Sequence, residues 1–359
     1  MRVALVYDRI NKWGGAERLI LALKKIYPNA DLFTSVYNKD TATWARTFKN
    51  IKTSFLQDFP LASSSHETYA ALMPIAFENF SFDNYDLVVS ITSESAKGII
   101  TRPGTRHVCF CLTPTRYLWS GYEIYFRNTL LRFFSKPIIS YLRYWDKIAS
   151  QRPDSYLAVS QEVKERIRKY YGRESKVLYP PLSFVQEKLK IQNIKNGKYF
   201  LVVSRLVPYK RIDLAIKACN KLNLPLKIVG IGSQKRYLKL ISKKNVEFLG
   251  FVSDNELSNL YKNCRALIFP GIEDFGTVMV EAQSFGKSVI AYRAGGALEI
   301  VREGKTGEFF NSQTADSLAN ILEKWDDKRY NSESCIRNSE RFSFKNFKKE
   351  FIGFLENNL

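Results

Sequence analysis

The feature that most limits the fold of this chain is an alternation of short apolar runs with amphipathic segments of helical period. The runs that predict strands are 2–7, 30–36, 86–91, 106–111 and 155–160, followed by 199–204, 225–230, 246–250, 265–270 and 287–292. Most neighbouring runs are separated by helical patterns rather than by hairpin turns, which is typical of parallel sheets covered on both faces. We therefore predict an α/β fold with two doubly wound, Rossmann-like domains.

The boundary between the two domains is predicted near residue 182. The segment 177–199 contains a Pro pair, a charged stretch and an Asn-Gly, with no clear apolar period, so we interpret it as a linker. This gives an N-terminal domain at 1–182 and a C-terminal domain at 183–342. Segment 343–359 has Phe and Leu residues three or four apart, which predicts a helix that buries one face and docks on a domain.

The charge balance indicates an anionic partner. The chain has 55 Lys and Arg against 35 Asp and Glu, a net charge of +20. Nucleic acid, an anionic membrane surface and phosphorylated small molecules are all possible partners of such a positive charge. The N-terminus lacks a signal-peptide core and no run reaches spanning length, so we expect a cytoplasmic, non-spanning protein. Five cysteines and two histidines favour buried free thiols over a disulfide framework or a zinc site.

Glycines and cations follow several of the predicted strands. Gly14 and Gly15 open a helix after the first strand, and Gly230 and Gly232 follow a strand of the second half without completing a dinucleotide fingerprint. A tight turn is the alternative for both pairs. Arg205, Lys210 and Arg211 precede an amphipathic helix, where positive charge is disfavoured. An anionic ligand would offset that cost, and a solvated turn is the alternative.

Two carboxylates flank the turn in the segment "GIEDFGTVMVEAQSFG" at 271–286. Glu273 is predicted at the carboxyl end of a strand, and Glu281 lies in the helix that follows. Acids near a helix start are often dipole partners, which suffices for Asp274. Glu281 lies among apolar residues, where an unpaired carboxylate would be costly. Hydrogen bonds to sugar hydroxyls would satisfy it.

At these residues the chain resembles the retaining nucleotide-sugar glycosyltransferases of family 4, which have the GT-B fold of two Rossmann-like domains facing across a cleft. The segments that carry the resemblance are "GGAERL", "SRLVPYKR", "EDFGTVMVE" and "AGGALEIV", and their order agrees over nearly the whole chain. The resemblance implies a sugar transferase and favours a mannosyltransferase of surface-glycan assembly. The donor would be a GDP- or UDP-linked sugar, acting as co-substrate without a further cofactor or a metal.

The resemblance also implies roles for individual residues. Glu281 would hold the ribose, and Glu273 would hold the transferred sugar together with the backbone of Phe275, Gly276 and Thr277. Arg205 and Lys210 would neutralise the diphosphate leaving group in place of a metal. Gly14 and Gly15 would let the first domain approach that diphosphate, and Phe251 and Val252 would lie near the base. On the acceptor side, the resemblance implies a loop with Thr113, Arg116, Tyr117 and Trp119.

The same loop departs from the family at Leu112, where relatives usually carry His, and at Ser120, where they often carry an acid. A catalytically silent sugar-nucleotide-binding protein is therefore one alternative function. Transfer to a soluble acceptor, as in sucrose or glycogen chemistry, is another. A basic nucleic-acid-binding protein would explain the charge, but no recognition motif is visible and the strand-end acids would repel phosphate.

Segment 125–152 interleaves basic and aromatic residues. Its basic residues are Arg127, Arg132, Lys136, Arg143, Lys147 and Arg152, against Asp146 alone. This composition suits an anionic lipid surface, and a lipid-linked acceptor at the inner face of the plasma membrane would explain it. The alternative is a core-packing helix pair with a solvated outer face.

Overall fold

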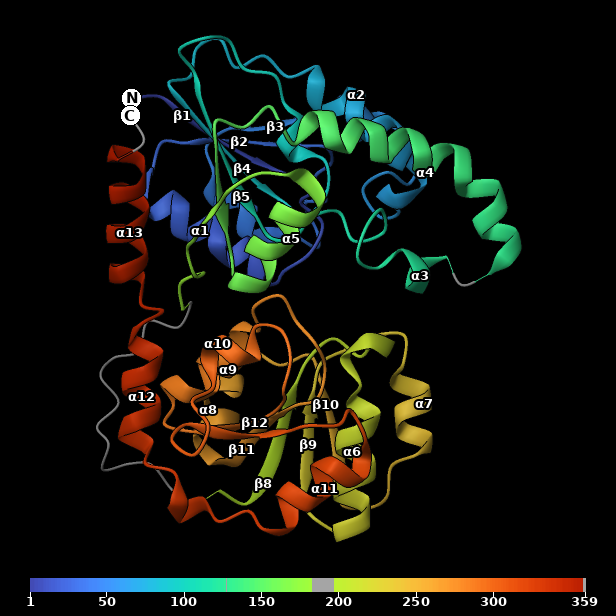
Figure 1. The fold of residues 1–359 in the computed structure, drawn as a ribbon, viewed down its shortest axis with the longest axis vertical. Coiled ribbons are helices and arrows are strands. Elements are labelled where there is room, and N and C mark those ends of the chain that lie inside the picture. The colour runs from blue at the N-terminus through green and yellow to red at the C-terminus, as the bar shows by residue number, and fades with distance from the viewer. Residues whose placement is uncertain (127, 183–196, 358–359) are drawn as a thin grey trace. The chain divides into compact units, whose positions relative to one another are not determined.

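The computed structural model describes residues 1–126, 128–182 and 197–357, which form two compact units (Figure 1). Unit 1 contains residues 1–180 and 350–359, and unit 2 contains residues 181–349. The boundary predicted between residues 182 and 183 lies two residues from this division. Most of the predicted linker lies outside the described residues.

Unit 1 is built on a seven-stranded parallel sheet with the order β3-β2-β1-β4-β5-β6-β7. The strands are β1 (Val3–Tyr7), β2 (Asp31–Thr34), β3 (Ile51–Thr53), β4 (Leu87–Thr92), β5 (Arg106–Cys111), β6 (Ser155–Ala158) and β7 (Lys176–Val177). The five strands predicted in this half are confirmed. The two edge strands, β3 and β7, were not predicted, because each is only two or three residues long and has no buried apolar run.

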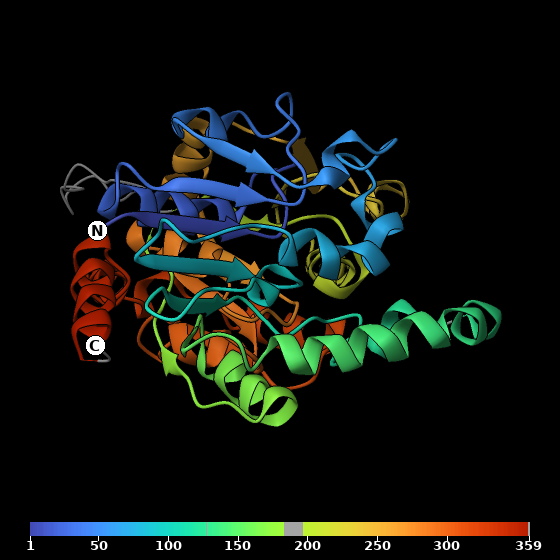
Figure 2. The ribbon, with the colours of Figure 1, turned by 90° about the horizontal axis from the view of Figure 1, so that it is seen from above.

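Helices cover both faces of this sheet, as apolar parallel strands require. They include α1 (Gly15–Ile26), α2 (Met73–Glu78), α4 (Thr129–Ala149) and α5 (Gln161–Tyr171), whereas the short α3 (Tyr122–Tyr125) lies away from the sheet in Figure 1. One core cluster joins Val6 and Val88 of the sheet to Ala76 and Phe77 of α2. In Figure 2, α4 runs outward from this unit, well beyond the ends of the strands.

Unit 2 has a six-stranded parallel sheet with the order β10-β9-β8-β11-β12-β13. The strands are β8 (Tyr199–Val203), β9 (Leu226–Val229), β10 (Val246–Gly250), β11 (Cys264–Phe269), β12 (Ser288–Tyr292) and β13 (Gly307–Phe310). The five predicted strands are confirmed. Strand β13 was missed, because its sequence GEFF is short and begins with Gly and Glu.

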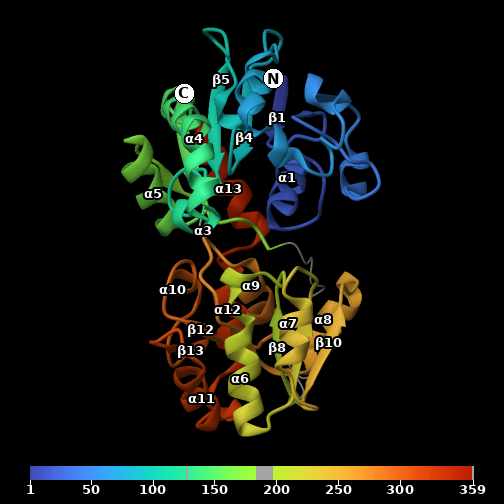
Figure 3. The same cartoon turned by 90° about the vertical axis from the view of Figure 1, so that its right-hand side faces the viewer.

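Seven helices flank the sheet of unit 2 in the described part of the chain. They are α6 (Ile212–Leu222), α7 (Lys235–Leu240), α8 (Asp254–Asn263), α9 (Thr277–Ser284), α10 (Ala297–Ile300), α11 (Ala315–Glu323) and α12 (Ser332–Glu340). Helices α6 and α11 lie on one face, in front of the strands in Figure 3, and α9 and α12 lie on the other (Figures 1 and 3). A core cluster joins Ile216 and Leu318 of the first pair to Ile228 and Ile268 of the sheet.

The last helix, α13 (Phe344–Glu356), ends in unit 1. The Phe351 ring lies 6.4 Å from that of Tyr27, and Arg106 donates a hydrogen bond to the backbone carbonyl of Leu355 at 2.6 Å. Phe347, Phe351 and Phe354 are buried, which accounts for the spacing read in the sequence.

Burial also governs two kinds of titratable side chain. All five cysteines are buried free thiols, and burial raises the pKa of Cys109 to about 12. Burial and two nearby arginines lower the pKa of His107 on β5 to about 3. Its Nε2 lies 2.8 Å from the Ser90 hydroxyl. The folded chain therefore keeps this imidazole neutral at pH values where the unfolded chain takes up a proton.

Replacing His107 with glutamine is expected to flatten the fall in stability on acidification. The pKa of His107 lies near 6.5 in the unfolded chain and near 3 in the folded one, so its contribution is complete above pH 6.5 and is lost as the pH falls toward 3. The slope of the unfolding free energy should decrease by about 1.4 kcal/mol per pH unit. Urea unfolding at several pH values between 4.5 and 6 measures it, and an unchanged slope would contradict the assignment.

Candidate functional site

The candidate site of unit 2 lies where the order of strands reverses. Strands β8 and β11 are neighbours in the sheet, although β9 and β10 lie between them in the sequence. In doubly wound sheets, ligands bind at the carboxyl ends of the strands at such a switch point. Arg205 and Lys210 follow β8, and Glu273 follows β11. The topology therefore brings these three predicted residues to the position where a ligand is expected.

Lys210 and Glu273 are in direct contact. The ammonium of Lys210 forms an ion pair with the carboxylate of Glu273, and both side chains are largely buried. The loops that carry them pack closely, because a Cβ on Gly271 would lie 2.9 Å from the Cα of Lys210. Arg205 is exposed, and its guanidinium donates a hydrogen bond to the Tyr209 hydroxyl at 2.6 Å. The site thus presents two cations beside one carboxylate.

The loop from Glu273 to Thr277 is shaped by contacts with the backbone of Gly296. The backbone N–H of Gly296 donates to the carbonyl of Glu273 at 2.9 Å, and a Cβ on Gly296 would lie 2.2 Å from the carbonyl oxygen of Phe275. Only glycine allows this approach. Gly276 has a φ of +92° and precedes α9, which begins at Thr277. The segment 294–301, noted in the sequence, therefore positions the loop that holds Glu273.

The structure corrects the inference that the Glu281 carboxylate needs sugar hydroxyls as hydrogen-bond partners. Its side chain is only 2% exposed, but it is not an orphan, because the Tyr261 hydroxyl of α8 donates a hydrogen bond to Oε2 at 2.8 Å. Sugar hydroxyls are therefore not needed to explain a carboxylate at this position. The contact with ribose remains a prediction from the resemblance.

Arg211 was interpreted as a ligand of an anion, but the structure shows it bonded to other side chains of the protein. It has a φ of +52°, and its guanidinium donates to Asp213 at 3.2 Å and to Gln313 at 3.4 Å. Gln313 in turn donates to the carbonyl of Pro270 at 3.0 Å. Arg211 therefore ties the start of α6 to a neighbouring loop, and the cations of the candidate site are Arg205 and Lys210.

The loops after β9 and β10 lie at the same edge of the sheet. The Leu206 N–H donates to the carbonyl of Ile231, and the Gly230 N–H donates to that of Gly250. Close backbone approach explains Gly230, because a Cβ there would lie 1.9 Å from the Ser204 oxygen. Phe251 and Val252 follow directly, and the Phe251 ring is 75% exposed. An exposed aromatic ring at this edge is available to a flat ligand.

The other predicted residues lie in unit 1. Gly14 is the residue before α1, and Gly15 is the first residue of that helix. Thr113 is buried and accepts a hydrogen bond from Arg166 at 3.4 Å. The ring of Trp119 stacks on Tyr170 at 5.3 Å. Burial raises the pKa of Tyr117 well above its ordinary value, so its hydroxyl stays protonated.

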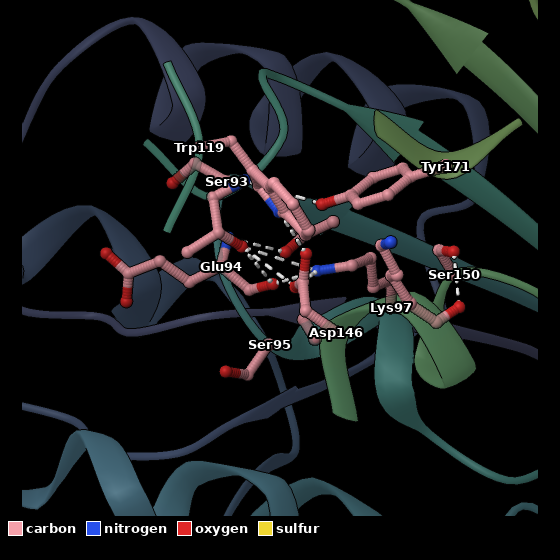
Figure 4. Close-up of polar contacts among 12 residues, drawn as sticks. Ser93, Glu94, Ser95, Lys97, Trp119, Asp146, Ser150 and Tyr171 are labelled. Carbon is pink, nitrogen blue, oxygen red and sulfur yellow. Dashed lines mark hydrogen bonds and ion pairs between the residues drawn. The ribbon is translucent and has the colours of Figure 1, made fainter. Parts of the chain in front are cut away.

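A buried ion pair contacts the loop that carries Thr113 and Trp119 (Figure 4). We did not predict this pair from the sequence. The ammonium of Lys97 lies 2.5 Å from Oδ1 of Asp146, and the two side chains are 2% and 1% exposed. Asp146 also accepts hydrogen bonds from the Thr115 hydroxyl at 3.0 Å and from the Trp119 indole at 2.7 Å. Asp146, on α4, therefore fixes two residues of the loop. Its position as the one acid in segment 125–152 was the signal that could have identified it.

The switch point of unit 1, between β1 and β4, is filled by protein contacts. Asp8, directly after β1, accepts hydrogen bonds from the Thr92 hydroxyl and from the backbone N–H groups of Ser93, Ser95 and Ala96. Next to it, Arg9 forms a 2.5 Å ion pair with Glu94. These bonds hold the two strand ends together and occupy the carboxylate of Asp8.

Most of unit 2 is similar to known proteins in sequence. Residues 184–342 match the family described as glycosyl transferases group 1. An uncharacterized glycosyltransferase of Methanocaldococcus jannaschii is 31% identical over 170 residues, covering 43% of this chain and 44% of that protein. The O-antigen chain mannosyltransferase RfbU of Salmonella typhimurium is 30% identical over 164 residues, covering 42% of this chain and 45% of that protein. The chain thus spans a little under half the length of these curated relatives.

Solved structures show the same fold over the whole chain. HepE of Anabaena, solved with UDP and glucose, is 20% identical with a TM-score of 0.71, covering 99% of this chain and 100% of that one. Sucrose-phosphate synthase of Thermosynechococcus elongatus is 14% identical with a TM-score of 0.74, covering 99% of both chains. The chain therefore has the GT-B fold with two Rossmann-like units, as predicted.

Proposed function

We propose that this chain, whose residues 184–342 belong to the glycosyl transferases group 1 family, transfers a sugar from a nucleotide diphosphate sugar to a glycan or lipid-linked acceptor. The observation that carries the proposal is the grouping of Arg205, Lys210 and Glu273 at the switch point of unit 2. Two cations suit a diphosphate, and a carboxylate beside them suits the hydroxyls of the attached sugar. Mannose is the sugar we favour, supported by the relatives named as mannosyltransferases.

The reaction that we propose retains the configuration of the sugar. The bond between the anomeric carbon and the diphosphate oxygen breaks, and a bond to the acceptor oxygen forms on the same face. The departing phosphate oxygen takes the proton of the acceptor hydroxyl. Negative charge accumulates on the leaving diphosphate, where Arg205 and Lys210 stabilise it without a metal. Glu273 holds the transferred sugar and keeps the Lys210 ammonium in place before the donor binds.

The acceptor and the location of the protein are the further parts of the proposal. Thr113, Arg116, Tyr117 and Trp119 line the acceptor side, on a loop that Asp146 holds from behind. We propose a cytoplasmic protein attached peripherally to the inner face of the plasma membrane, supported by the net charge of +20. Within the described part of the chain, no helix has both the length and the apolar character needed to cross a membrane.

The test is the release of nucleotide from a panel of GDP- and UDP-linked sugars by the full chain. We expect release from one donor, which would identify both the base and the sugar. Glu281→Gln should raise the KM for that donor about tenfold or more, because the amide cannot accept two charge-assisted hydrogen bonds from ribose hydroxyls. The matched control is Glu247→Gln, which changes an exposed acid of the same unit that pairs with Lys227.

The outcomes separate the candidate functions. Absence of both release and binding for every donor would contradict the proposal. Tight binding of one donor without release would instead favour a sugar-nucleotide-binding protein, the alternative raised by Leu112. Equal KM values for Glu281→Gln and the wild type would show that Glu281 does not bind the donor. Its role would then be the hydrogen bond with Tyr261.

A further inference from the structure

Helix α4 has an apolar face that the protein does not cover. The helix begins at Thr129 and ends at Ala149, and its inward side chains include Ile139, Leu142 and Trp145, which are buried. Seven other large apolar or aromatic side chains of the helix are exposed to solvent, with Phe133 at 71% and Phe134 at 73%. We call these seven the α4 outer face: Leu130, Phe133, Phe134, Ile138, Tyr141, Tyr144 and Ile148.

The spacing of these residues places them on one side of the helix. They follow one another at intervals of three or four positions, apart from the adjacent pair at 133 and 134, as an α-helical stripe requires. The stripe lies opposite Ile139 and Asp146, which face the protein. In Figure 2 the first half of α4 extends away from the rest of unit 1, so Leu130, Phe133, Phe134 and Ile138 lie on the part that projects. The exposed side of α4 therefore carries these apolar side chains together with the exposed cations Arg132, Lys136 and Lys147.

The charges beside this stripe are positive. Arg132, Lys136, Arg143 and Lys147 lie on α4, and its one acid, Asp146, is buried against Lys97. Arg143 donates to the carbonyl of Leu118 at 2.7 Å, and Arg132 pairs with the exposed Glu123 at 3.1 Å. Lys136 is exposed. Basic residues along the flank of an aromatic and aliphatic stripe are typical of helices that lie in the interface of an anionic membrane.

We propose that the α4 outer face docks on an anionic lipid bilayer. Large exposed apolar patches on soluble proteins mark interaction surfaces, and removal of this one from water favours binding. An anionic bilayer also complements the flanking cations. A second copy of the chain would instead bring like charges together along the stripe, which opposes pairing. The connection to a lipid-borne acceptor rests on the proposed function, whereas the docking itself does not.

The experiment is co-sedimentation of the full chain with vesicles of phosphatidylcholine, with and without phosphatidylglycerol. We expect binding to the anionic vesicles that weakens with salt, since the charge contribution is screened. Phe133→Gln with Phe134→Gln should weaken binding about tenfold or more, because two apolar side chains lose their burial in the interface. Both residues are exposed, so the fold should tolerate the change. The matched control is Tyr237→Gln with Leu240→Gln, two exposed apolar residues of α7.

Three results would overturn the proposal. The first is a wild-type chain that stays in solution with either vesicle. The second is equal binding by the Phe133 and Phe134 double variant and the wild type. The third is a wild-type dimer, without lipid, that this variant converts to a monomer, because the stripe would then be an interface between copies. Vesicle binding is measured without donor, so a failure of the proposed transferase activity would leave this result unaffected.

Discussion

Replacement of Lys210 by alanine is expected to lower kcat for sugar transfer by about 100-fold to 1,000-fold, the range seen when one preorganised donor to a developing charge is removed. Lys210 lies on the loop that follows β8, and its ammonium contacts Glu273 at the point where the leaving diphosphate is proposed to bind. Its charge matters most in the transition state, when the bond to the sugar has weakened. The loss should therefore fall on kcat more than on KM.

The measurement is steady-state nucleotide release with the donor that the panel identifies. Lys217→Ala is the matched control, because Lys217 lies on the next helix, is half exposed and pairs with Asp213 at 3.7 Å. It should change kcat by less than about twofold, as expected of an exposed ion pair. If Lys210→Ala has the same kcat as this control, Lys210 takes no part in the chemical step. Arg205→Ala should act in the same direction as Lys210→Ala.

Replacement of Lys97 by methionine is expected to lower the free energy of unfolding of unit 1 by about 3–5 kcal/mol. The substitution strands the Asp146 carboxylate in a buried site, with only the Thr115 and Trp119 donors left. Burial alone would lower the pKa of Lys97, but the attraction of Asp146 outweighs it and the pKa is raised. The pair is therefore charged in the folded protein, and removal of one partner leaves a charge without its counter-ion.

Urea unfolding followed by tryptophan fluorescence measures this effect. Four of the five tryptophans belong to unit 1, and only Trp325 belongs to unit 2, so the signal reports mainly on unit 1. Arg168→Met is the control, because it breaks an exposed pair of unit 1, with Glu174, and should cost less than about 1 kcal/mol. Adding Asp146→Asn to Lys97→Met should restore part of the stability, because the stranded charge is gone. Equal losses for Lys97→Met and Arg168→Met would show that the buried pair contributes no more than a surface one.

Strand positions could be predicted because buried parallel strands leave apolar runs in the sequence. The ten predicted strands are present, and the three that were missed are two to four residues long. The order of strands in the sheet has no such local signal. The sequence alone therefore could not show that the loop with Lys210 and the loop with Glu273 meet, because β9 and β10 separate them along the chain.

Contacts of buried polar residues were the other part that the sequence did not reveal. Glu281 was correctly placed among apolar neighbours, but its partner Tyr261 lies 20 residues away on a different helix. Lys97 gave no signal, because lysines are almost always exposed and a buried one needs a partner that only the fold supplies. Arg211 was grouped with Arg205 and Lys210 by position, whereas its left-handed backbone conformation turns it toward Asp213 and Gln313.

The measurement that tests the central claim most directly is a crystal structure of the full chain with the nucleoside diphosphate that the release panel selects. The account predicts that the diphosphate lies at the carboxyl ends of β8 and β11, within hydrogen-bonding distance of the Arg205 guanidinium and the Lys210 ammonium. A diphosphate bound elsewhere, with Lys210 still paired only to Glu273, would contradict it.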